Sequence, residues 1–415
     1  MKFIELTEEE FKNYVTGNPQ ASFLQTVEWG SLRKIYGSDI RYLGIKEDDK
    51  VLAATMVSID KAALGKKRMY APRGFIIDYH NKELLKFFTE EIKKYAKKNN
   101  ILFIKIDPNI IYQVRDINGD EYPNSNKDDE AINNLKELGY IHSGFTLDLG
   151  DSQSRWNFRL TLDKEYEELA KNFSKSTRKN IESTYNRGMR VRVATLEDLP
   201  SMEEILIATA ERKNFQYRSL EYYTNMFKTI KDGVRIYIAY LDPNIYLEST
   251  EKLLSEANKN KEEVLYKMEK DMVGPKLKND LIQADKQITK YTEELELAKK
   301  FKEENPNGKD IGTLVSLVSG DEYLTLYSGI MMEYKKFTPK YLMYNEHIKD
   351  AYKLGMKYID FYGITGHFNK DDKDYGMYEF KRGFGGEVIE MIGEFTLPTS
   401  KLYPIYKFLK KLKQR

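Results

Sequence analysis

Residues suited to acyl or phosphate chemistry gather in a glycine-rich segment near the end of the chain. Residues 379–386, Glu-Phe-Lys-Arg-Gly-Phe-Gly-Gly, place Lys381 beside Phe380 and close to three glycines. Glycines let a backbone approach a ligand closely, and a lysine there can stabilise an oxyanion or bind a phosphate. A helix that ends at a glycine stop has the same pattern, and the residues alone favour that simpler interpretation. The segment has neither the GxxxxGK[ST] order of a P-loop nor the RxxGxG/A order that binds coenzyme A in acetyltransferases.

Arginines near aromatic residues form a second group. Arg33 follows Trp29 by four residues, which puts both side chains on one side of a helix. Arg212 and Arg218 lie around the aromatic-rich segment AERKNFQYRSLEYY. Such arginines can clamp a diphosphate bidentately or can be stacked structural cations. For the first pair, the pattern alone favours a core tryptophan beside a surface arginine.

A strongly basic segment runs from residue 171 to residue 192. It contains one acidic residue and seven basic ones, which are Lys171, Lys175, Arg178, Lys179, Arg187, Arg190 and Arg192. The whole chain is balanced, with 67 Lys+Arg against 65 Asp+Glu, so this local excess stands out. It indicates either a solvated helix face or a site for an anionic partner, for which RNA phosphate is the natural candidate.

Asp107 follows the apolar segment 101–106, where a strand would leave its sheet. Functional groups are common there in open α/β sheets, but an Asp-Pro turn looks the same, so both interpretations stay open. The four histidines are scattered, no HExxH or GxSxG motif occurs, and there is no cysteine. We therefore expect no metal site, no cysteine nucleophile and no serine hydrolase.

The elements that must position these residues follow the same order in both halves of the chain. The first half is expected to contain a hairpin, a helix, a strand, a helix and a strand, at 40–45 with 51–59, 82–98, 101–106, 129–138 and 141–149. After a strand at 234–241, the second half repeats this order at 313–318 with 323–328, 342–354, 357–362, 377–382 and 388–397. This repeat predicts an α/β protein with tandem acetyltransferase-like (GNAT) domains.

A helical arm separates two strands of the second unit. Residues 246–304 are nearly all helix formers, apart from Val273-Gly274-Pro275. Pro275 cannot continue a helix, and Gly274 suits a helix C-terminus. Apolar residues alternate three and four apart along both arms, which predicts an antiparallel coiled-coil hairpin.

The length of 415 residues is too great for one ordinary core. The expected domains are 1–150, then 151–245 plus 306–415, with the helical arm 246–305 inserted in the second.

The C-terminal segment places Leu402, Ile405, Leu409 and Leu412 on one helical face, with lysines elsewhere. We expect either a helix that caps a domain or a peripheral anchor at a membrane surface. The start of the chain lacks a signal-peptide pattern, and no apolar stretch approaches the roughly 20 residues that span a bilayer. A cytoplasmic protein is expected, in peripheral contact with the plasma membrane if the anchor interpretation holds.

Taken in order, these segments resemble the Fem peptidyltransferases, the group that includes FemA, FemB, FemX and MurM. The resemblance covers the full length and is carried by FLQTVEWGSLRK, YAPRGFIIDY, FIKIDP, SKSTRKNI, AERKNFQYRSLEYY, TLYSG, IDFYGITG and YEFKRGFGGEVIEMIGEF. It implies an aminoacyltransferase that uses aminoacyl-tRNA as donor and lipid II or UDP-MurNAc-pentapeptide as acceptor, building an interpeptide bridge. It implies no cofactor besides the aminoacyl-tRNA co-substrate.

The resemblance also implies roles for single residues. Phe380 and Lys381 match the family's Phe-Lys pair at the acyl-transfer centre, and Asp107 matches its strand-end aspartate near the acceptor. The expected acceptor site, including the diphosphate contacts Arg33 and Arg212, consists of Trp29, Arg33, Arg212, Arg218 and Tyr327. The expected tRNA contacts are Lys175, Arg178 and Lys179. Thr325 departs from the pattern, because some members have an aromatic residue there.

The expected chemistry is attack of an amine on an aminoacyl ester. Orienting the two groups can contribute up to about 7–11 kcal/mol, and Lys381 would stabilise the oxyanion. Asp107, a substrate phosphate and the tRNA ribose are alternative acceptors of the amine's proton. Two other functions fit the residues: an acetyl-CoA-dependent N-acetyltransferase, and a non-enzymatic RNA- or partner-binding protein that works through its coiled coil. A monomer and a homodimer are both compatible with the hairpin.

Overall fold

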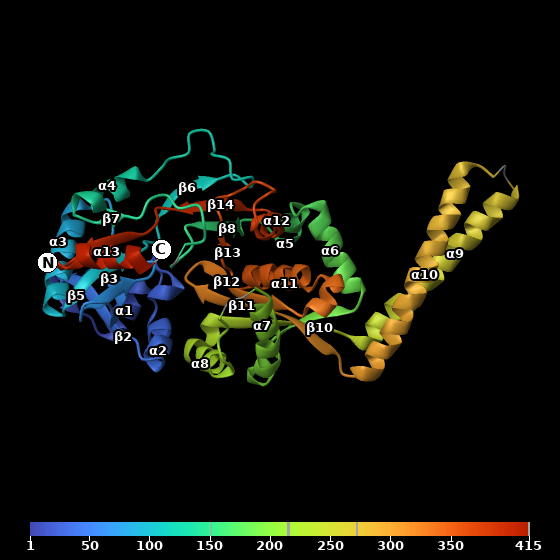
Figure 1. Ribbon diagram of the computed structural model, residues 1–415, viewed down its shortest axis with the longest axis horizontal. Helices are drawn as coiled ribbons and strands as arrows, with labels where there is room; N and C mark the ends of the chain where they lie inside the picture. Colours follow the sequence, from blue (N-terminus) through green and yellow to red (C-terminus); the bar gives the residue numbers. More distant parts are fainter. Residues whose placement is uncertain (151, 214–215, 271–272, 414–415) are drawn as a thin grey trace.

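Two mixed β-sheets lie side by side, and a long helical hairpin projects from the second (Figure 1). The computed structural model describes all residues except 151, 214–215, 271–272 and 414–415. Four short 3-10 helices join the larger elements: η1 (Phe23–Gln25), η2 (Leu196–Asp198), η3 (Lys231–Gly233) and η4 (Met332–Phe337). No helix in the described part of the chain has the length and apolar character needed to cross a membrane.

The first sheet has the order β1-β2-β3-β4-β5-β15-β7. Its strands are β1 (Lys2–Glu5), β2 (Asp39–Glu47), β3 (Lys50–Lys61), β4 (Lys67–Ala71), β5 (Ile101–Ile106), β15 (Phe395–Pro398) and β7 (Ile141–His142). Only β4 and β5 pair in parallel. Helices that pack on it include α1 (Glu8–Val15), α2 (Val27–Ile35), α3 (Lys82–Lys98) and α4 (Asp129–Glu137).

The second sheet has the order β6-β14-β8-β13-β12-β11-β10-β9. Its strands are β6 (Ile111–Arg115), β14 (Glu387–Met391), β8 (Trp156–Thr161), β13 (Tyr358–Ile364), β12 (Glu322–Ile330), β11 (Lys309–Ser319), β10 (Val234–Leu241) and β9 (Met189–Val193). One face packs against α7 (Leu199–Lys213) and α8 (Leu220–Ile230). The other carries α5 (Tyr166–Lys171), α6 (Lys175–Asn186), α11 (Pro339–Lys353) and α12 (Tyr375–Arg382).

The same chain path occurs in both sheets. Three antiparallel strands (β2, β3 and β4, or β10, β11 and β12) lead into a helix that returns the chain to a parallel neighbour (α3 to β5, or α11 to β13). The predicted fold class, two acetyltransferase-like α/β units with an inserted helical hairpin, is confirmed.

The two sheets exchange strands, so the expected domain boundaries do not separate them. β6 lies within the range 1–150 but belongs to the second sheet, whereas β15 lies near the C-terminus and belongs to the first. The single strand expected at 388–397 is therefore two strands in different sheets. Gly393, with a φ of +90°, allows the turn between them. The strand expected at 141–149 is also shorter, since β7 ends at His142.

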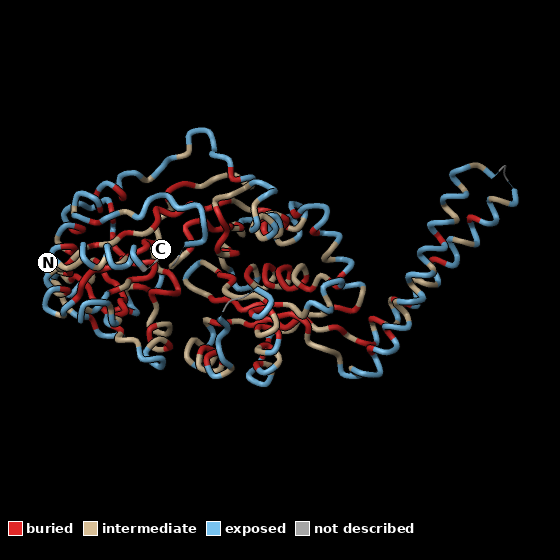
Figure 2. Tube along the Cα trace, viewed as in Figure 1, coloured by how far each residue is buried: buried red, intermediate tan, exposed pale blue. Residues whose placement is uncertain are grey.

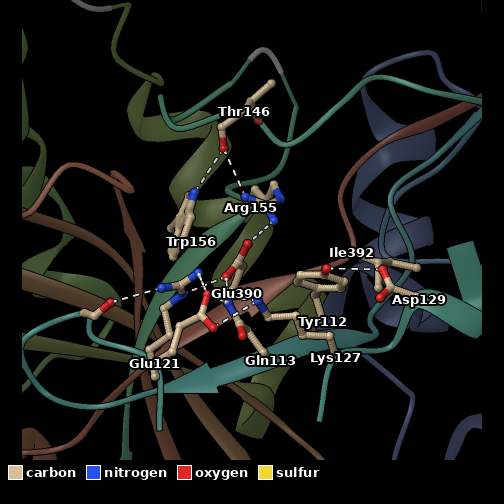
Figure 3. A network of polar contacts seen from close by, with 12 residues as sticks. Tyr112, Gln113, Glu121, Lys127, Asp129, Thr146, Arg155, Trp156, Glu390 and Ile392 are labelled. Carbon is tan, nitrogen blue, oxygen red and sulfur yellow. Dashed lines mark hydrogen bonds and ion pairs between the residues drawn. The ribbon is translucent and has the colours of Figure 1, made fainter. Parts of the chain in front are cut away.

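A buried ion network ties the exchanged strand β6 to its neighbours in the second sheet (Figure 3). Glu390 of β14 accepts hydrogen bonds from Arg115 Nε at 2.8 Å and Gln113 Nε2 at 2.6 Å, both on β6. Its other oxygen pairs with Arg155, which precedes β8. Arg155 and the indole of Trp156 also donate to the carbonyl of Thr146, in the loop that follows β7. The network thus joins segments that are far apart in the sequence.

The predicted helical hairpin consists of α9 (Pro243–Lys270) and α10 (Pro275–Glu304). Buried residues follow its inner side (Figure 2), including Ala257, Val264 and Ala284. Gly274 is the N-cap of α10 and not the C-terminal cap of α9, because its φ of −84° is not left-handed and Pro275 begins the helix. At the base, Glu294 accepts from Arg187 and Lys336, each at 3.0 Å.

The C-terminal helix α13 (Tyr403–Lys413) docks on the first sheet through tyrosines. The rings of Tyr403 and Tyr406 lie 5.6 and 5.2 Å from that of Phe103 in β5. The face expected to be apolar points to solvent, where Ile405 and Leu412 are 50% and 52% exposed. The helix therefore caps the domain, but with the opposite face from the leucines.

Candidate active site

Asp107 lies at the end of β5 in a buried polar position. Its two oxygens accept from the hydroxyl of Tyr70 at 2.6 Å and the backbone N–H of Arg73 at 2.5 Å. Burial raises the pKa of Asp107 to about 6, although the charge of Arg73 and the Tyr70 hydrogen bond favour the ionised form. The carboxylate can therefore take up a proton near neutral pH.

Lys381 lies in the last turn of α12 and is 5% exposed. Its amine donates to the backbone carbonyls of Tyr362 at 2.9 Å and Gly363 at 2.7 Å. Burial lowers the pKa of Lys381 to about 7; nearby Asp360 opposes this shift and Lys340 adds to it. Phe380 packs edge-on against Tyr341 and Tyr344 on α11, with ring centroids 5.1 and 4.8 Å away.

Tyr362 connects these two groups. It lies in β13 with a φ of +62°, where an irregularity follows Asp360, whose carboxylate accepts from the Tyr362 N–H at 2.6 Å. Its carbonyl binds Lys381, and its hydroxyl donates to Gln153. Burial raises the pKa of Tyr362 to about 12; the charges of Asp360 and Asp107 also raise it, and that of Arg73 lowers it. Tyr362, which was not predicted, thus binds Lys381 through its carbonyl, and its hydroxyl reaches Gln153, which lines a cavity together with Asp107.

Two cavities open beside Tyr362 and share Arg73 in their walls. One, of about 340 Å³, is lined by Phe23, Asn157, Arg159, Glu322, Asp360 and Tyr362 among others. The second, of about 620 Å³, is lined by Asp107, Gln153, Arg155, Lys373 and Glu394 among others. Burial raises the pKa of both Glu322 and Asp360, and the charge of Asp360 raises that of Glu322 further. Asp107 and Tyr362 therefore face charged cavities between the two sheets, whereas Lys381 lines neither of them.

A bulge in β12 decides where Tyr327 points. The register with β11 shifts between Thr325 and Tyr327, so these residues face opposite sides of the sheet. Thr325 contacts the buried His347, at 3.2 Å between Oγ1 and Nε2. Tyr327 packs edge-on against Tyr223 at 6.3 Å, and Arg218 is close enough to act on its pKa, which burial raises. Thr325, which replaces an aromatic residue of some family members, is thus a core residue here.

The remaining predicted acceptor residues lie on neighbouring helices. Trp29 is half-buried on α2 and packs edge-on against Phe23 at 5.1 Å, so it is a packing residue beside the smaller cavity. Arg33 is half-buried in the last turn of α2, which packs against α8. Arg212 is exposed in the last turn of α7, near Lys340 and through it near Lys381. Neither of the two cavities is lined by Arg33, Arg212 or Lys381, so the structure does not bring these three cations together in one described cavity.

The predicted tRNA contacts Lys175, Arg178 and Lys179 are all exposed on α6. The other basic residues of this segment include structural ones. Arg187 pairs with Glu294 at the base of the hairpin, and Arg192 pairs with Asp198 and Asp310. The excess of positive charge available to a partner is therefore smaller than the sequence suggests.

The residues of the site that were not predicted include Arg73, Lys340, Asp360 and Tyr362. Arg73 and Asp360 lie within the family-like segments YAPRGFIIDY and IDFYGITG, where a charged residue among apolar ones is a usable signal, and Tyr362 lies in the second of these segments. Lys340 carries no such signal, because only the fold brings it to Phe380. Among the described residues, no group of three or more His, Cys, Asp or Glu side chains could hold a metal ion.

Comparison with known proteins identifies the family. The FemAB family model matches residues 6–411. Aminoacyltransferase FemA of Staphylococcus epidermidis is 31% identical over 418 residues, and that of Staphylococcus aureus is 30% identical over 419, each covering 100% of both chains. The crystal structure of FemX is 26% identical, with a TM-score of 0.77 over 99% of this chain and 100% of that one. The chain belongs to the FemAB family, as its resemblance to the Fem peptidyltransferases implied.

Proposed function

We propose that the protein transfers an aminoacyl group from aminoacyl-tRNA to the stem-peptide amine of a peptidoglycan precursor. The acceptor is lipid II or UDP-MurNAc-pentapeptide, and the new amide founds or extends an interpeptide bridge. The observation that carries the proposal is the match of this chain to aminoacyltransferase FemA from end to end, and the buried Lys381 and Asp107 are groups suited to that reaction.

The chain's own residues supply a route for this reaction. The amine attacks the ester carbonyl, and the Lys381 ammonium stabilises the charge that develops on the carbonyl oxygen. Asp107 takes the proton from the attacking amine and returns it to the ribose oxygen as the C–O bond breaks. Aminoacyl-tRNA is a co-substrate, and we propose no other cofactor.

Binding roles follow from the positions of the other residues. Trp29, Arg33, Arg212, Arg218 and Tyr327 hold the acceptor, with the two arginines Arg33 and Arg212 on its diphosphate. The exposed cations Lys175, Arg178 and Lys179 on α6 contact tRNA phosphates.

The test is to incubate the protein with charged tRNA pools and each acceptor, and to weigh the products by mass spectrometry. One acceptor should gain the mass of one or more aminoacyl residues, which also names the amino acid and the acceptor. Acetylation of a substrate by acetyl-CoA, without aminoacyl transfer, would contradict the proposal in favour of an N-acetyltransferase.

Asp107→Asn is expected to lower kcat by about 10²-fold, because the amide keeps the shape of the carboxylate but cannot take a proton. The wild-type rate should rise as pH increases through about 6, where Asp107 loses its proton. The variant should lack this rise. Rate profiles of both proteins between pH 5 and pH 8 check the prediction, and an unchanged profile in the variant would assign the proton to a substrate group.

We also propose that the protein works in the cytoplasm and touches the inner face of the plasma membrane through α13. Ile405, Phe408 and Leu412 form an exposed apolar face, and lysines flank it. Such a helix binds anionic lipid surfaces through apolar burial and charge.

Changing Ile405 and Leu412 together to Asp is expected to reduce binding to vesicles of anionic phospholipid by about tenfold or more, because two apolar contacts are lost. Sedimentation with vesicles measures the bound fraction. Leu297→Asp is the matched control, since Leu297 is 52% exposed but lies on the hairpin. Equal binding by all three proteins would show that α13 only caps the domain.

A further inference from the structure

Lys340 lies in the first turn of α11, beside the Phe380-Lys381 pair. Its amine is 6.0 Å from the ring centroid of Phe380, and the next residue, Tyr341, packs on the same ring. Burial lowers the pKa of Lys340, and the nearby charges of Arg212 and Lys213 lower it further. Lys340 in turn lowers the pKa of Lys381. Lys340 therefore lies beside the Phe380-Lys381 pair and within reach of the charges of Arg212 and Lys213 at the end of α7.

The packing of the elements explains why these cations meet. The hydroxyl of Thr209 on α7 accepts from the N–H of Ile330 at the end of β12, so the end of α7 lies where β12 leaves the sheet. Arg212 and Lys213 follow within one turn. The chain then passes through η4 into α11, whose first turn carries Lys340. The arrangement is built by the fold and not by neighbours in the sequence.

These cations differ from the other lysines nearby. Lys336 pairs with Glu294 at 3.0 Å, and Lys349, on the same helix as Lys340, pairs with Glu346 at 2.7 Å. Within the described ranges of the chain, no carboxylate lies within ion-pairing distance of Lys340 or Arg212. A group of like charges that is partly removed from water is unfavourable unless an anion joins it.

The start of α11 adds to the positive potential at this place. Its N-cap, Thr338, is left-handed with a φ of +49°, and its side chain caps no backbone N–H. The N-terminal end of this 15-residue helix therefore keeps its partial positive charge, and Lys340 lies in its first turn. The charge of several cations suits a phosphate better than a single carboxylate.

We propose that Lys340, together with Arg212 and Lys213, binds a substrate phosphate beside the acyl-transfer centre. The identity of that phosphate rests on the proposed function, in which two groups have this chemistry. One is the diphosphate of the acceptor, and the other is the phosphodiester next to the 3′-terminal nucleotide of the donor tRNA. In both cases Lys340 is a binding residue on the Lys381 side of Arg212.

Direct binding tests the proposal without any transfer reaction. Calorimetry with UDP presents a diphosphate, and calorimetry with the trinucleotide CCA presents the donor's phosphodiesters. Lys340→Met keeps the length of the side chain. It should weaken the binding of one of the two probes by about tenfold, because a charge-assisted contact is lost. The affinity of this variant for that probe should also depend less on salt concentration, by the equivalent of about one charge. Lys340→Arg should restore binding, and Lys353→Met, at the exposed end of α11, should bind like the wild type.

Weaker UDP binding assigns the site to the acceptor, and weaker CCA binding assigns it to the donor. Unchanged dissociation constants for both probes in Lys340→Met would overturn the proposal. If this variant unfolds early in thermal melts, Lys340→Gln replaces it in the same comparison.

Kinetic measurements provide a second test, because a purely structural role of Lys340 would change neither the KM nor the pH profile. Lys340→Met should raise the KM of the substrate whose probe it weakens. It should also shift the basic limb of the pH profile upward, because a positive charge next to Lys381 is gone. A wild-type protein that transfers no aminoacyl group would refute the proposed function, while the two probes would still decide whether Lys340 binds phosphate.

Discussion

Lys381→Met is expected to lower kcat by about 10²–10³-fold, the effect of removing one preorganised donor to an oxyanion. Methionine fills the same buried space but has no proton to donate. The two backbone carbonyls that now hold the amine keep their place in β13 and can accept from water or neighbouring groups. Steady-state kinetics with saturating acceptor and aminoacyl-tRNA measure the loss, which should fall on kcat and much less on KM.

The pH dependence separates this role from a structural one. The wild-type rate should fall as pH rises through about 7, since Lys381 then loses the proton that stabilises the oxyanion. With Asp107 titrating near 6, the full profile is a narrow bell, and Lys381→Met should have no basic limb.

The folding stability of the wild type should change with pH in the opposite direction to the rate, and should increase as pH rises. The folded pKa of Lys381, about 7, lies below the ordinary value of 10.5. Below pH 7 the buried, protonated lysine therefore lowers the free energy of unfolding, and this destabilisation disappears as pH rises toward 10.5. At pH 6 the methionine variant should be at least as stable as the wild type in thermal melts. A folded variant with full activity would remove Lys381 from the mechanism.

Local patterns predicted the elements of this fold well. The helix expected at 82–98 is α3 with the same bounds, and the strand at 101–106 is β5. The helical hairpin could be predicted because its heptad spacing and its Gly-Pro break both depend on residues that are close in the sequence. The predicted order of elements led to the fold class because a helix between two parallel strands fixes their connection.

Features that depend on contacts between distant segments were not predictable in this way. β6 has no strong strand signal and exists because β14 pairs with it. An apolar run such as 388–397 does not reveal that Gly393 sends its two halves to different sheets. The bulge that separates Thr325 from Tyr327 also arises from pairing with β11.

The candidate site shows the same division. Lys381, Phe380 and Asp107 came from motifs and a family resemblance. The structure places Lys381 on the carbonyl of Tyr362, and Asp107 in the wall of a cavity that the Tyr362 partner Gln153 also lines. Lys340 was missed because its importance lies only in the cations around it. Arg187 and Arg192 were counted with the free cations because only the fold brings their acidic partners to them. Glu294 and Asp310 are more than a hundred residues away in the sequence, and Asp198 is six residues from Arg192.

Glu390→Ala is expected to lower the free energy of unfolding by about 3–5 kcal/mol, the usual cost of removing one partner from a buried ion group. The change leaves Arg155, whose side chain is 3% exposed, without its carboxylate, and takes from Arg115 one of its two acidic partners. It also removes the contact that ties β6 and β14 to the segment before β8 (Figure 3). Urea unfolding followed by circular dichroism gives the free energy.

A matched control lies three residues earlier on the same strand. Glu387 pairs with Arg159, but both side chains are more exposed, at 24% and 17%. Glu387→Ala should therefore cost about 1 kcal/mol or less. A double variant, Glu390→Met with Arg155→Met, removes both the carboxylate and the most deeply buried cation. Because it leaves no unpaired charge at position 155, it should be more stable than Glu390→Ala alone. If it is less stable than the single variant, the contacts of Arg155 with Thr146 and Trp156 stabilise the fold by more than its unpaired charge costs.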